Sequence, residues 1–223
     1  MERKLIVTED GSHTIEIAAL HTNYHSIHGA FQESMHVFIS AGLEYFLVNN
    51  YKSNVHVFEM GFGTGLNALL ALKYAMERNI AVYYQSIELF PLEKNEYEKL
   101  NYCEMFQNNF KEEFGLLHDC SWEKDISITE KFVLYKSQIS LVDVILEHKF
   151  DIIFFDAFDP AIQPELWTYD VFKKLYECLN EKGVLVTYSS KGDVRRALIA
   201  AGFRIEKISG PKGKREMLRA IKL

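Results

Sequence analysis

The chain has 223 residues, of which 48% are hydrophobic and 25% are charged, with a formal net charge of −6. This length suits one α/β domain with a modest extension, and the net charge argues against a generally basic nucleic-acid-binding protein. No apolar run approaches the roughly 20 residues of a membrane-spanning helix, and the N-terminus has no signal-peptide core. The three cysteines form no CxxC pair, which indicates free thiols in a reducing compartment. We therefore expect a cytoplasmic protein without a membrane partner.

The positive charge is concentrated near the C-terminus. From Lys191 to Leu223 there are ten Lys/Arg and three Asp/Glu, a local charge of +7, whereas residues 1–190 carry 15 basic and 28 acidic groups, a charge of −13. A basic end on an acidic body suggests an anionic partner that docks at this end. A solubilising charged surface is the alternative interpretation.

Residues 1–50 stand apart from the rest of the chain. Leu5–Thr8 and Thr14–Ala19 flank a glycine-containing turn, which predicts a β-hairpin. Apolar residues near helical spacing predict a helix within Gly29–Asn50. We expect an N-terminal extension packed on a main domain that spans residues 51–223.

The segment from Val55 onward is the most informative part of the sequence. Val55–Met60 is typical of a buried strand, a glycine loop follows it, and Leu66–Arg78 has the periodicity of a helix. This order begins a nucleotide-binding unit, because glycine lets the backbone approach a ligand closely. The loop residues expected to contact a cofactor are Gly61, Phe62, Gly63 and Gly65.

The residue before this loop narrows the type of ligand. Glu59 precedes the glycines and no Lys-Ser/Thr pair closes the loop, which excludes a phosphate-binding P-loop. An acidic residue here disfavours a pyrophosphate and suits the sulfonium and ammonium groups of S-adenosylmethionine. We therefore expect S-adenosyl-L-methionine as the cofactor, with Glu59 among its contacts.

Strands and helices alternate in the remainder of the chain. The expected strands are Ala81–Leu89, Lys131–Tyr135, Phe150–Asp156 and Gly183–Tyr188, and the expected helices begin near Leu92 and span Ser140–His148, Pro164–Leu179 and Asp193–Ala201, with an insertion of helix and loop at 103–130. Phe203–Ile208 and Met217–Ile221 predict a closing antiparallel pair. This pattern matches the α/β fold of class I S-adenosylmethionine-dependent methyltransferases, a Rossmann-like, seven-stranded sheet with an antiparallel last strand.

Two carboxylates end predicted strands. Glu88 lies 23 positions after Gly65, where doubly wound folds place an acid that accepts hydrogen bonds from ribose hydroxyls; stabilisation of the next helix dipole is the alternative. Asp156 ends the buried run FDIIFFD and emerges at the carboxyl edge of the sheet. There its side chain would contact the cofactor, orient an amine nucleophile and accept a proton from that amine.

The loop after this strand and the final hairpin hold the expected substrate contacts. Phe158 and Trp167 are candidates for stacking on a splayed-out base, with core packing as the alternative. The run Asp156-Ala157-Phe158-Asp159-Pro160 resembles the acid-x-x-Pro-aromatic loops of amino-group methyltransferases, with the aromatic residue shifted. For Asp159-Pro160, a turn that starts the next helix is the alternative. Lys212, Lys214 and Arg215 flank Gly213 and are candidates for phosphate contacts, with a solvated turn as the alternative.

Three histidines near the N-terminus do not predict a metal site. His21, His25 and His28 have the spacing of helical ligands, but their segment, HTNYHSIHGAFQES, has no carboxylate before Glu33 and is loop-like. Tyr24, His25 and Ser26 are better candidates for residues that cover the active site.

Four ordered segments together resemble a known family. EMGFGTGLNALL, DAFDPAIQPELWT and GPKGKREMLRA, with YHSIHGAFQESMHVFI near the N-terminus, resemble the methyltransferase domain of bacterial tRNA 5-methylaminomethyl-2-thiouridine synthases of the MnmC type. The resemblance spans nearly the whole chain. It implies methyl transfer from S-adenosylmethionine to 5-aminomethyl-(2-thio)uridine at the wobble position of the tRNA anticodon loop.

The resemblance also implies roles for individual residues. By position, Glu59, Gly61, Gly63 and Glu88 would hold the cofactor, and Asp156 would lie at the transfer centre with Phe158 and Pro160 shaping the base pocket. The chain ends at Leu223, so we expect a stand-alone form without the flavin-dependent oxidoreductase domain of longer members. Separate enzymes would then supply its aminomethyl substrate.

One departure and two alternatives accompany this interpretation. Many class I methyltransferases read the adenine with an acid after the third strand, but this chain has Ser137 and Gln138 there, which leaves Asp119, Asp125 or a backbone amide. A polyamine (spermidine-type) synthase shares the fold, although Thr64 stands where its glycine loop usually has an acid. An RNA-binding protein that retains the fold without turnover is the third class.

Overall fold

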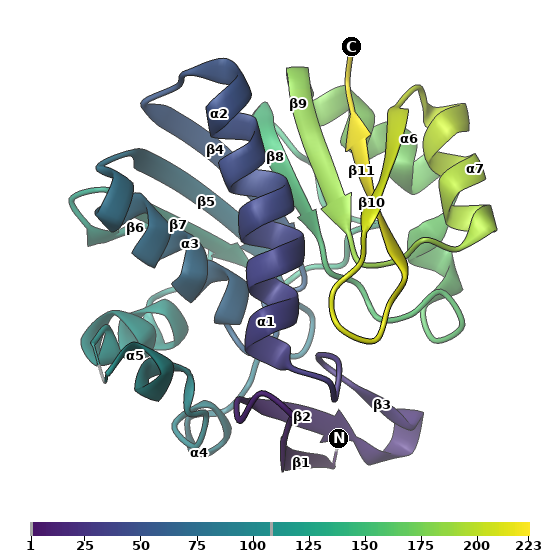
Figure 1. Cartoon of the computed structure of the whole chain (residues 1–223). Coiled ribbons are helices and arrows are strands. Elements are labelled where there is room, and N and C mark those ends of the chain that lie inside the picture. The colour runs from purple at the N-terminus through teal and green to yellow at the C-terminus, as the bar shows by residue number, and fades with distance from the viewer. Residues whose placement is uncertain (1, 108) are drawn as a thin grey trace.

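The computed structural model describes residues 2–107 and 109–223 and contains an eight-stranded sheet (Figure 1). The spatial order is β10-β11-β9-β8-β4-β5-β7-β6. These strands are Asn54–Met60 (β4), Ala81–Ile87 (β5), Asp125–Thr129 (β6), Phe132–Ser137 (β7), Phe150–Phe155 (β8), Leu179–Thr187 (β9), Arg204–Ser209 (β10) and Glu216–Ile221 (β11). Strands β7, β5, β4, β8 and β9 are parallel, whereas β11 is antiparallel to both β9 and β10.

The sheet confirms the expected fold with one strand more than the seven that the sequence predicted. The additional strand, β6, comes from the insertion at 103–130 and pairs antiparallel with β7 at the sheet edge. Its sequence DISIT alternates polar and apolar residues as a strand does, but the alternation covers only five residues and includes only two apolar ones, so the signal is short.

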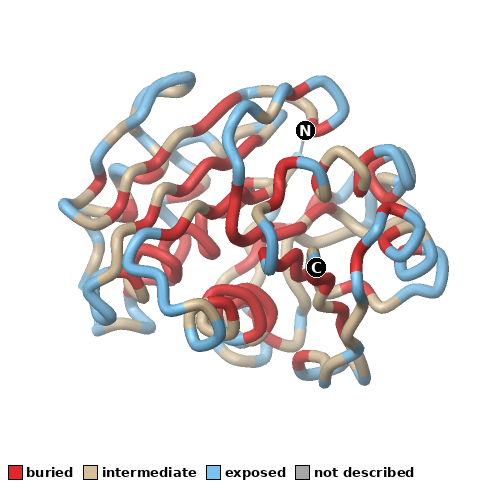
Figure 2. The backbone as a smooth tube through the Cα atoms, turned by 90° about the horizontal axis from the view of Figure 1, so that it is seen from above, coloured by how far each residue is buried: buried red, intermediate tan, exposed pale blue. Residues whose placement is uncertain are grey.

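Helices cover both faces of the sheet. They are Ala30–Ser34 (α1), Met35–Glu44 (η2), Tyr45–Asn50 (α2), Leu66–Arg78 (α3), Lys94–Tyr97 (α4), Tyr102–Phe106 (η3), Lys111–Asp119 (α5), Pro164–Trp167 (η4), Tyr169–Cys178 (α6) and Gly192–Ala201 (α7). One buried apolar cluster joins the sheet to the α1–η2–α2, α3 and α5 layer, and a second joins its other face to α6 and α7. Figure 2 shows the buried residues following the interior strands and helices, with exposed residues at the periphery. None of the helices in the described ranges combines the length and apolarity needed to span a membrane.

Two expected helices differ from the structure. Residues Ser140–His148 form no helix, but a single turn followed by extended loop, in which Leu141 and Val144 are buried while Val142 and Ile145 are exposed. The expected helix at Pro164–Leu179 is divided into η4 and α6, because Thr168 adopts an extended conformation and caps α6 by accepting from the Val171 N–H.

The N-terminal segment forms a small sheet and one long helix. Strands Arg3–Val7 (β1), His13–Ile17 (β2) and Thr22–Asn23 (β3) form an antiparallel sheet, with a 3₁₀ turn at Ala18–Leu20 (η1), so the predicted hairpin is confirmed. In the long helix, α1, η2 and α2 follow one another without a break and cross the face of the main sheet (Figure 1).

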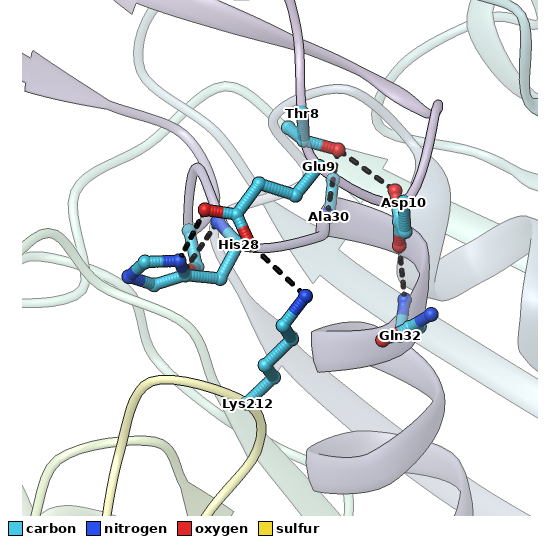
Figure 3. Close-up of polar contacts among 8 residues, drawn as sticks. Thr8, Glu9, Asp10, His28, Ala30, Gln32 and Lys212 are labelled. Carbon is cyan, nitrogen blue, oxygen red and sulfur yellow. Dashed lines mark hydrogen bonds and ion pairs between the residues drawn. The ribbon is translucent and has the colours of Figure 1, made fainter.

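The final hairpin lies against the N-terminal segment. Lys214 Nζ is 2.8 Å from Glu33 Oε1, and Lys212 Nζ is 3.0 Å from Glu9 Oε2. Figure 3 shows that Glu9 also accepts from His28, whose Nδ1 lies 2.8 Å from Glu9 Oε1. We call these five side chains the terminal clasp. Lys212 and Glu9 are both about half exposed, so their pair adds little stability, whereas Glu33 is buried.

Candidate active site

A pocket opens at the carboxyl edge of the parallel strands, where α/β sheets bind their ligands. Its wall includes the loop after β4, the residues after β5, the loop after β7, the residues after β8 and part of the N-terminal sheet. Side chains and backbone of Tyr24, His25, Gly61, Phe62, Gly63, Thr64, Asn67, Glu88, Ile139, Ser140, Leu141, Asp156, Phe158, Gln163 and Glu165 contribute to it.

The glycine loop is packed too tightly for side chains. A Cβ on Gly61, which has φ +89°, would lie 3.1 Å from the Asp156 carbonyl oxygen. A Cβ on Gly63, with φ +50°, would lie 3.0 Å from the Tyr24 ring. Both positions therefore need glycine for backbone conformation and for space, and the predicted tight loop is present.

Glu88 organises two loops and still faces the pocket. Its Oε2 accepts from the Gly63 N–H at 2.9 Å and its Oε1 accepts from the Phe90 N–H at 2.8 Å. A carboxylate has about four acceptor sites, so two lone pairs remain for hydroxyl donors. This geometry suits the vicinal hydroxyls of a ribose.

Asp156 is held on the opposite wall by Asn67. Asn67, in the first turn of α3, donates from Nδ2 to Asp156 Oδ2 at 2.8 Å. Burial raises the pKa of Asp156 from its ordinary value of 3.8 to about 7, and the Asn67 hydrogen bond opposes part of this shift. Asp156 therefore changes charge near neutral pH, as a general base requires.

The N-terminal sheet covers the pocket. The Tyr24 ring lies over Gly63 and packs edge-on against Phe158, with ring centroids 5.2 Å apart. Arg3 ties the same sheet to the loop after β5 through the Phe90 and Pro91 carbonyls and Glu96. Two predicted covering residues, Tyr24 and His25, thus line the pocket.

The loop after β7 forms the side of the pocket where the sequence offers no acid. Ile139, Ser140 and Leu141 line this side with mostly apolar groups. Lys174 of α6 fixes the loop from behind, because its Nζ donates to the carbonyls of Leu141, Val142 and Val144 at 2.9, 2.9 and 2.8 Å. Asp119 and Asp125, the acids that the sequence offered for reading an adenine, lie outside the pocket wall.

A Lys174→Met variant is expected to bind S-adenosylhomocysteine about tenfold more weakly, because three charge-assisted hydrogen bonds that fix the loop are lost. Isothermal titration calorimetry measures the effect. Lys173→Met is the matched control, since the neighbouring Lys173 contacts Glu177 and the Tyr176 ring on its own helix and does not bond the loop after β7 in the described part of the chain. Equal affinities in the two variants would show that Lys174 does not shape the cofactor pocket.

Several predicted site residues lie outside the pocket. Glu59 is 0% exposed and accepts from Ser86 Oγ at 2.7 Å, behind the wall rather than in it. Trp167 is 6% exposed, packs against Phe155 and Phe172, and donates to the Phe158 carbonyl. The stacking interpretation of Trp167 is therefore replaced by the core-packing one.

Four further predicted contacts are not part of the pocket wall: Ser26, Gly65, Asp159 and Pro160. Gly65 is the N-cap of α3, and the backbone N–H of Ser26 donates to Glu33 Oε2 at 2.8 Å. Asp159 pairs with Lys191 and, with Pro160, starts the turn that follows β8. Neither Asp159 nor Pro160 lines the pocket.

Two of the three histidines with helical ligand spacing, His25 and His28, bond different partners. His25 shares a hydrogen bond with Thr14, and His28 bonds Glu9. Burial lowers the pKa of His25 to about 4, so its ring is neutral. Across residues 2–107 and 109–223 no three His, Cys, Asp or Glu side chains gather in a way that would hold a metal ion.

Two pocket residues were missed by the sequence analysis. Asn67 stands as a polar residue in the apolar first turn of α3, and that exception was the available signal. Gln163 accepts from the Phe158 N–H through Oε1 at 3.0 Å and so fixes the loop after β8. No local pattern marks Gln163, because its role depends on how the loop folds back.

The fold and the pocket together define a class I S-adenosylmethionine-dependent methyltransferase. The glycine cradle, the Glu88 acceptor and the apolar loop after β7 fit the methionine, ribose and adenine parts of that cofactor. The family model described as S-adenosyl-L-methionine-dependent methyltransferase matches residues 98–223. The chain belongs to this family.

Known relatives agree with this assignment. An uncharacterized protein of Methanocaldococcus jannaschii is 29% identical over 99% of this chain and 60% of its own length. The tRNA 5-methylaminomethyl-2-thiouridine biosynthesis bifunctional protein MnmC of Campylobacter hominis is 32% identical over 88% of this chain, and that of Leptospira interrogans is 30% identical over 87%. The chain spans only 29% and 32% of those two MnmC proteins, respectively.

Solved structures support the same family. The crystal structure of MNMC2 from Aquifex aeolicus superposes with a TM-score of 0.80 and 28% identity, over 98% of this chain and 69% of that one. The sugar N-methyltransferase KedS8 from Streptoalloteichus has a TM-score of 0.50 and 13% identity, over 86% of this chain and 87% of that one, and shows the fold alone.

Proposed function

We propose that this methyltransferase converts 5-aminomethyl-(2-thio)uridine to 5-methylaminomethyl-(2-thio)uridine at the wobble position of tRNA. The observation that carries the proposal is Asp156, a carboxylate in the pocket wall whose charge changes near neutral pH and whose orientation Asn67 fixes. The similarity to MnmC proteins and to MNMC2 supports tRNA as the substrate.

The chemistry requires a base near the methyl donor. An alkyl ammonium has a reference pKa near ~10.4, so at neutral pH the acceptor amine arrives protonated and without a free lone pair. Asp156 would take one proton from this nitrogen onto a carboxylate oxygen. The cofactor, when bound, supplies an electrophilic methyl group on its sulfonium. The nitrogen–carbon bond then forms as the carbon–sulfur bond breaks, and most of the rate enhancement comes from alignment of the two groups.

The pocket walls also offer a place for the uridine ring of the substrate. Phe158 is partly exposed in the pocket, beside Tyr24, and its backbone is fixed by Gln163 and Trp167. An aromatic ring held in this way supports stacking on an extruded uridine. The wobble base lies in a single-stranded loop, so its extrusion costs less than that of a paired base.

Methyl transfer from labelled S-adenosylmethionine to bulk tRNA tests the proposal. The tRNA comes from a strain that lacks this activity, and nucleoside analysis identifies the product. Label in 5-methylaminomethyl-(2-thio)uridine would support reaction, substrate and position together. Absence of label there, with aminopropyl transfer to putrescine from the decarboxylated cofactor, would favour the polyamine synthase alternative, which the relatives named above do not support.

The final hairpin is the proposed docking surface for the tRNA backbone. Of the three basic residues in the turn of this hairpin, Lys212 and Lys214 belong to the terminal clasp, whereas Arg215 is exposed and has no ion pair within the described ranges. The exposed Lys212 pair is weak enough to be exchanged for a phosphate contact.

Changing Lys212, Lys214 and Arg215 to Ala is expected to weaken tRNA binding and to flatten its dependence on salt. Each lost phosphate contact reduces the slope of log K against log salt by about 0.7–0.9. Filter binding at several salt concentrations measures the slope. The control triple, Arg78, Lys131 and Lys149 to Ala, removes equal charge near the amino ends of the strands. Equal slopes in both triples would rule out the hairpin as the docking surface.

A further inference from the structure

Three buried polar atoms without partners gather behind the pocket wall. They are Glu59 Oε1, Asn67 Oδ1 and the Tyr84 hydroxyl. Glu59 and Tyr84 are 0% exposed and Asn67 is 3% exposed. The side chains of Asn67 and Tyr84 both lie beside the Glu59 carboxyl. A buried polar atom left unpaired is destabilising, so three in one place require an explanation.

An ionised Glu59 does not explain them. The titratable groups that face its carboxyl are Tyr84 on β5 and Asp156 after β8, whereas α3 presents only the uncharged Asn67. Within the described part of the chain, Glu59 makes no ion pair with Lys, Arg or His. Burial raises its pKa from 4.5 to about 8, and the like charge of Asp156 adds to the shift. A buried carboxylate without a cation would be strongly destabilising.

A neutral Glu59 explains all three atoms. A protonated carboxyl has one O–H donor together with acceptor sites on its oxygens. Glu59 Oε2 accepts from Ser86 Oγ at 2.7 Å. A proton on Oε1 would provide a donor for the amide oxygen of Asn67, and the remaining lone pairs of the carboxyl would accept from the Tyr84 hydroxyl; these are the two other atoms that otherwise lack a partner. When the amide oxygen of Asn67 is engaged in this way, its Nδ2 remains turned toward Asp156.

We propose that Glu59 is a neutral carboxylic acid that positions Asn67, and through it Asp156, rather than a charged contact for the cofactor. Glu59 is thus a positioning residue that acts on Asp156 through Asn67, which itself lines the pocket. The catalytic consequence of this placement rests on the proposed function of Asp156. The protonation state of Glu59 and its role in holding Asn67 do not depend on the identity of the methyl acceptor.

A Glu59→Gln variant tests the charge directly, because glutamine is a neutral near-isostere with one donor and one acceptor. The variant is expected to fold and to bind S-adenosylhomocysteine within about twofold of wild type, since no charge is removed. A charged contact to the cofactor would instead cost at least tenfold in affinity, roughly the worth of one hydrogen bond to a charged group. That loss, or failure of the variant to fold, would overturn the proposal.

The pH dependence of stability provides a second readout. The pKa of Glu59 is raised on folding, so its contribution to stability is fully present below pH 4.5 and is lost as pH rises through about 8. The melting temperature of Glu59→Gln is therefore expected to match wild type near pH 5 and to exceed it increasingly toward pH 9. A difference that does not grow with pH would contradict a neutral Glu59.

Infrared difference spectroscopy of wild type minus Glu59→Gln at pH 7 completes the test. A protonated-carboxyl carbonyl band is expected in the difference, and a carboxylate band in its place would overturn the proposal.

Glu59→Leu separates positioning from charge, because leucine is neutral but cannot form a hydrogen bond with Asn67. It is expected to shift the acidic limb of the pH–rate profile upward, while Glu59→Gln leaves that limb in place. If Glu59→Leu and Glu59→Gln have the same pH–rate profile, Glu59 does not position Asp156 through Asn67. The folding, binding and spectroscopic measurements use no tRNA, so they stand even if the proposed substrate is wrong.

Discussion

Asp156→Asn is expected to lower the rate of methyl transfer by about 10²–10⁴-fold, the usual contribution of a positioned general base. Asparagine keeps the shape of the side chain and an oxygen that still accepts from Asn67 Nδ2, but it cannot accept the ammonium proton. Single-turnover methyl transfer to substrate tRNA measures the effect. A rate near that of wild type would remove Asp156 from the mechanism.

The same variant has a signature in stability that separates loss of chemistry from loss of fold. Because burial raises the pKa of Asp156 to about 7, its ionised form is disfavoured in the folded protein. The stability linked to this group is present below pH 3.8 and lost as pH rises through about 7. Asp156→Asn is therefore expected to melt at or above the wild-type temperature at pH 8, and a marked decrease would indicate a structural role.

Glu88→Gln is expected to weaken S-adenosylhomocysteine binding by about 100-fold. The carboxylate orders the Gly63 and Phe90 N–H groups and would also accept two ribose hydroxyls, and hydrogen bonds to a charged group contribute about 1.5–3 kcal/mol each. In glutamine an amide nitrogen replaces one of the two carboxylate oxygens, and this nitrogen cannot accept a hydrogen bond. Calorimetric titration of the purified variant gives the affinity.

Glu123→Gln is the matched control for this variant. Glu123 also accepts a backbone N–H, that of Gln138, and a hydroxyl, that of Tyr135, but it does not line the pocket. Its replacement is expected to leave the affinity within about twofold, well under one hydrogen bond to a charged group. A similar loss in both variants would show that Glu88 acts through general loop order rather than through the cofactor.

The elements around the glycine loop were predictable because their signals are local. The helix Leu66–Arg78 was predicted with its observed bounds, and β4 differs by one residue at its start. Both have a long apolar pattern and glycines at the turn. The expected helix at Ser140–His148 was wrong because its apolar residues have helical spacing, while the chain is held as a loop by Lys174 from α6. That contact spans more than 30 residues and leaves no local mark.

The same distinction divides the site residues. Asp156 and Glu88 follow buried strands, so their place at the carboxyl edge follows from sequence order alone. The partners of Lys212 and Lys214 come from the first part of the chain, and Trp167 turns inward to bond the Phe158 carbonyl. Counting charges along the sequence identified a basic C-terminal end. It could not show that Lys212 and Lys214 are paired with Glu9 and Glu33, because these ion pairs depend on tertiary packing.

The terminal clasp has a consequence for how the protein becomes active during its synthesis. The Lys214–Glu33 contact joins residues 181 positions apart, which at 5–20 residues per second separates their synthesis by roughly 10–40 s. Glu9 and Glu33 leave the ribosome long before their lysine partners, so these two ion pairs cannot form until the final hairpin has been synthesised. The side of the protein that faces the hairpin therefore stays open on the nascent chain after the β4–α3 cradle has been made, and its closure belongs to the last steps of folding.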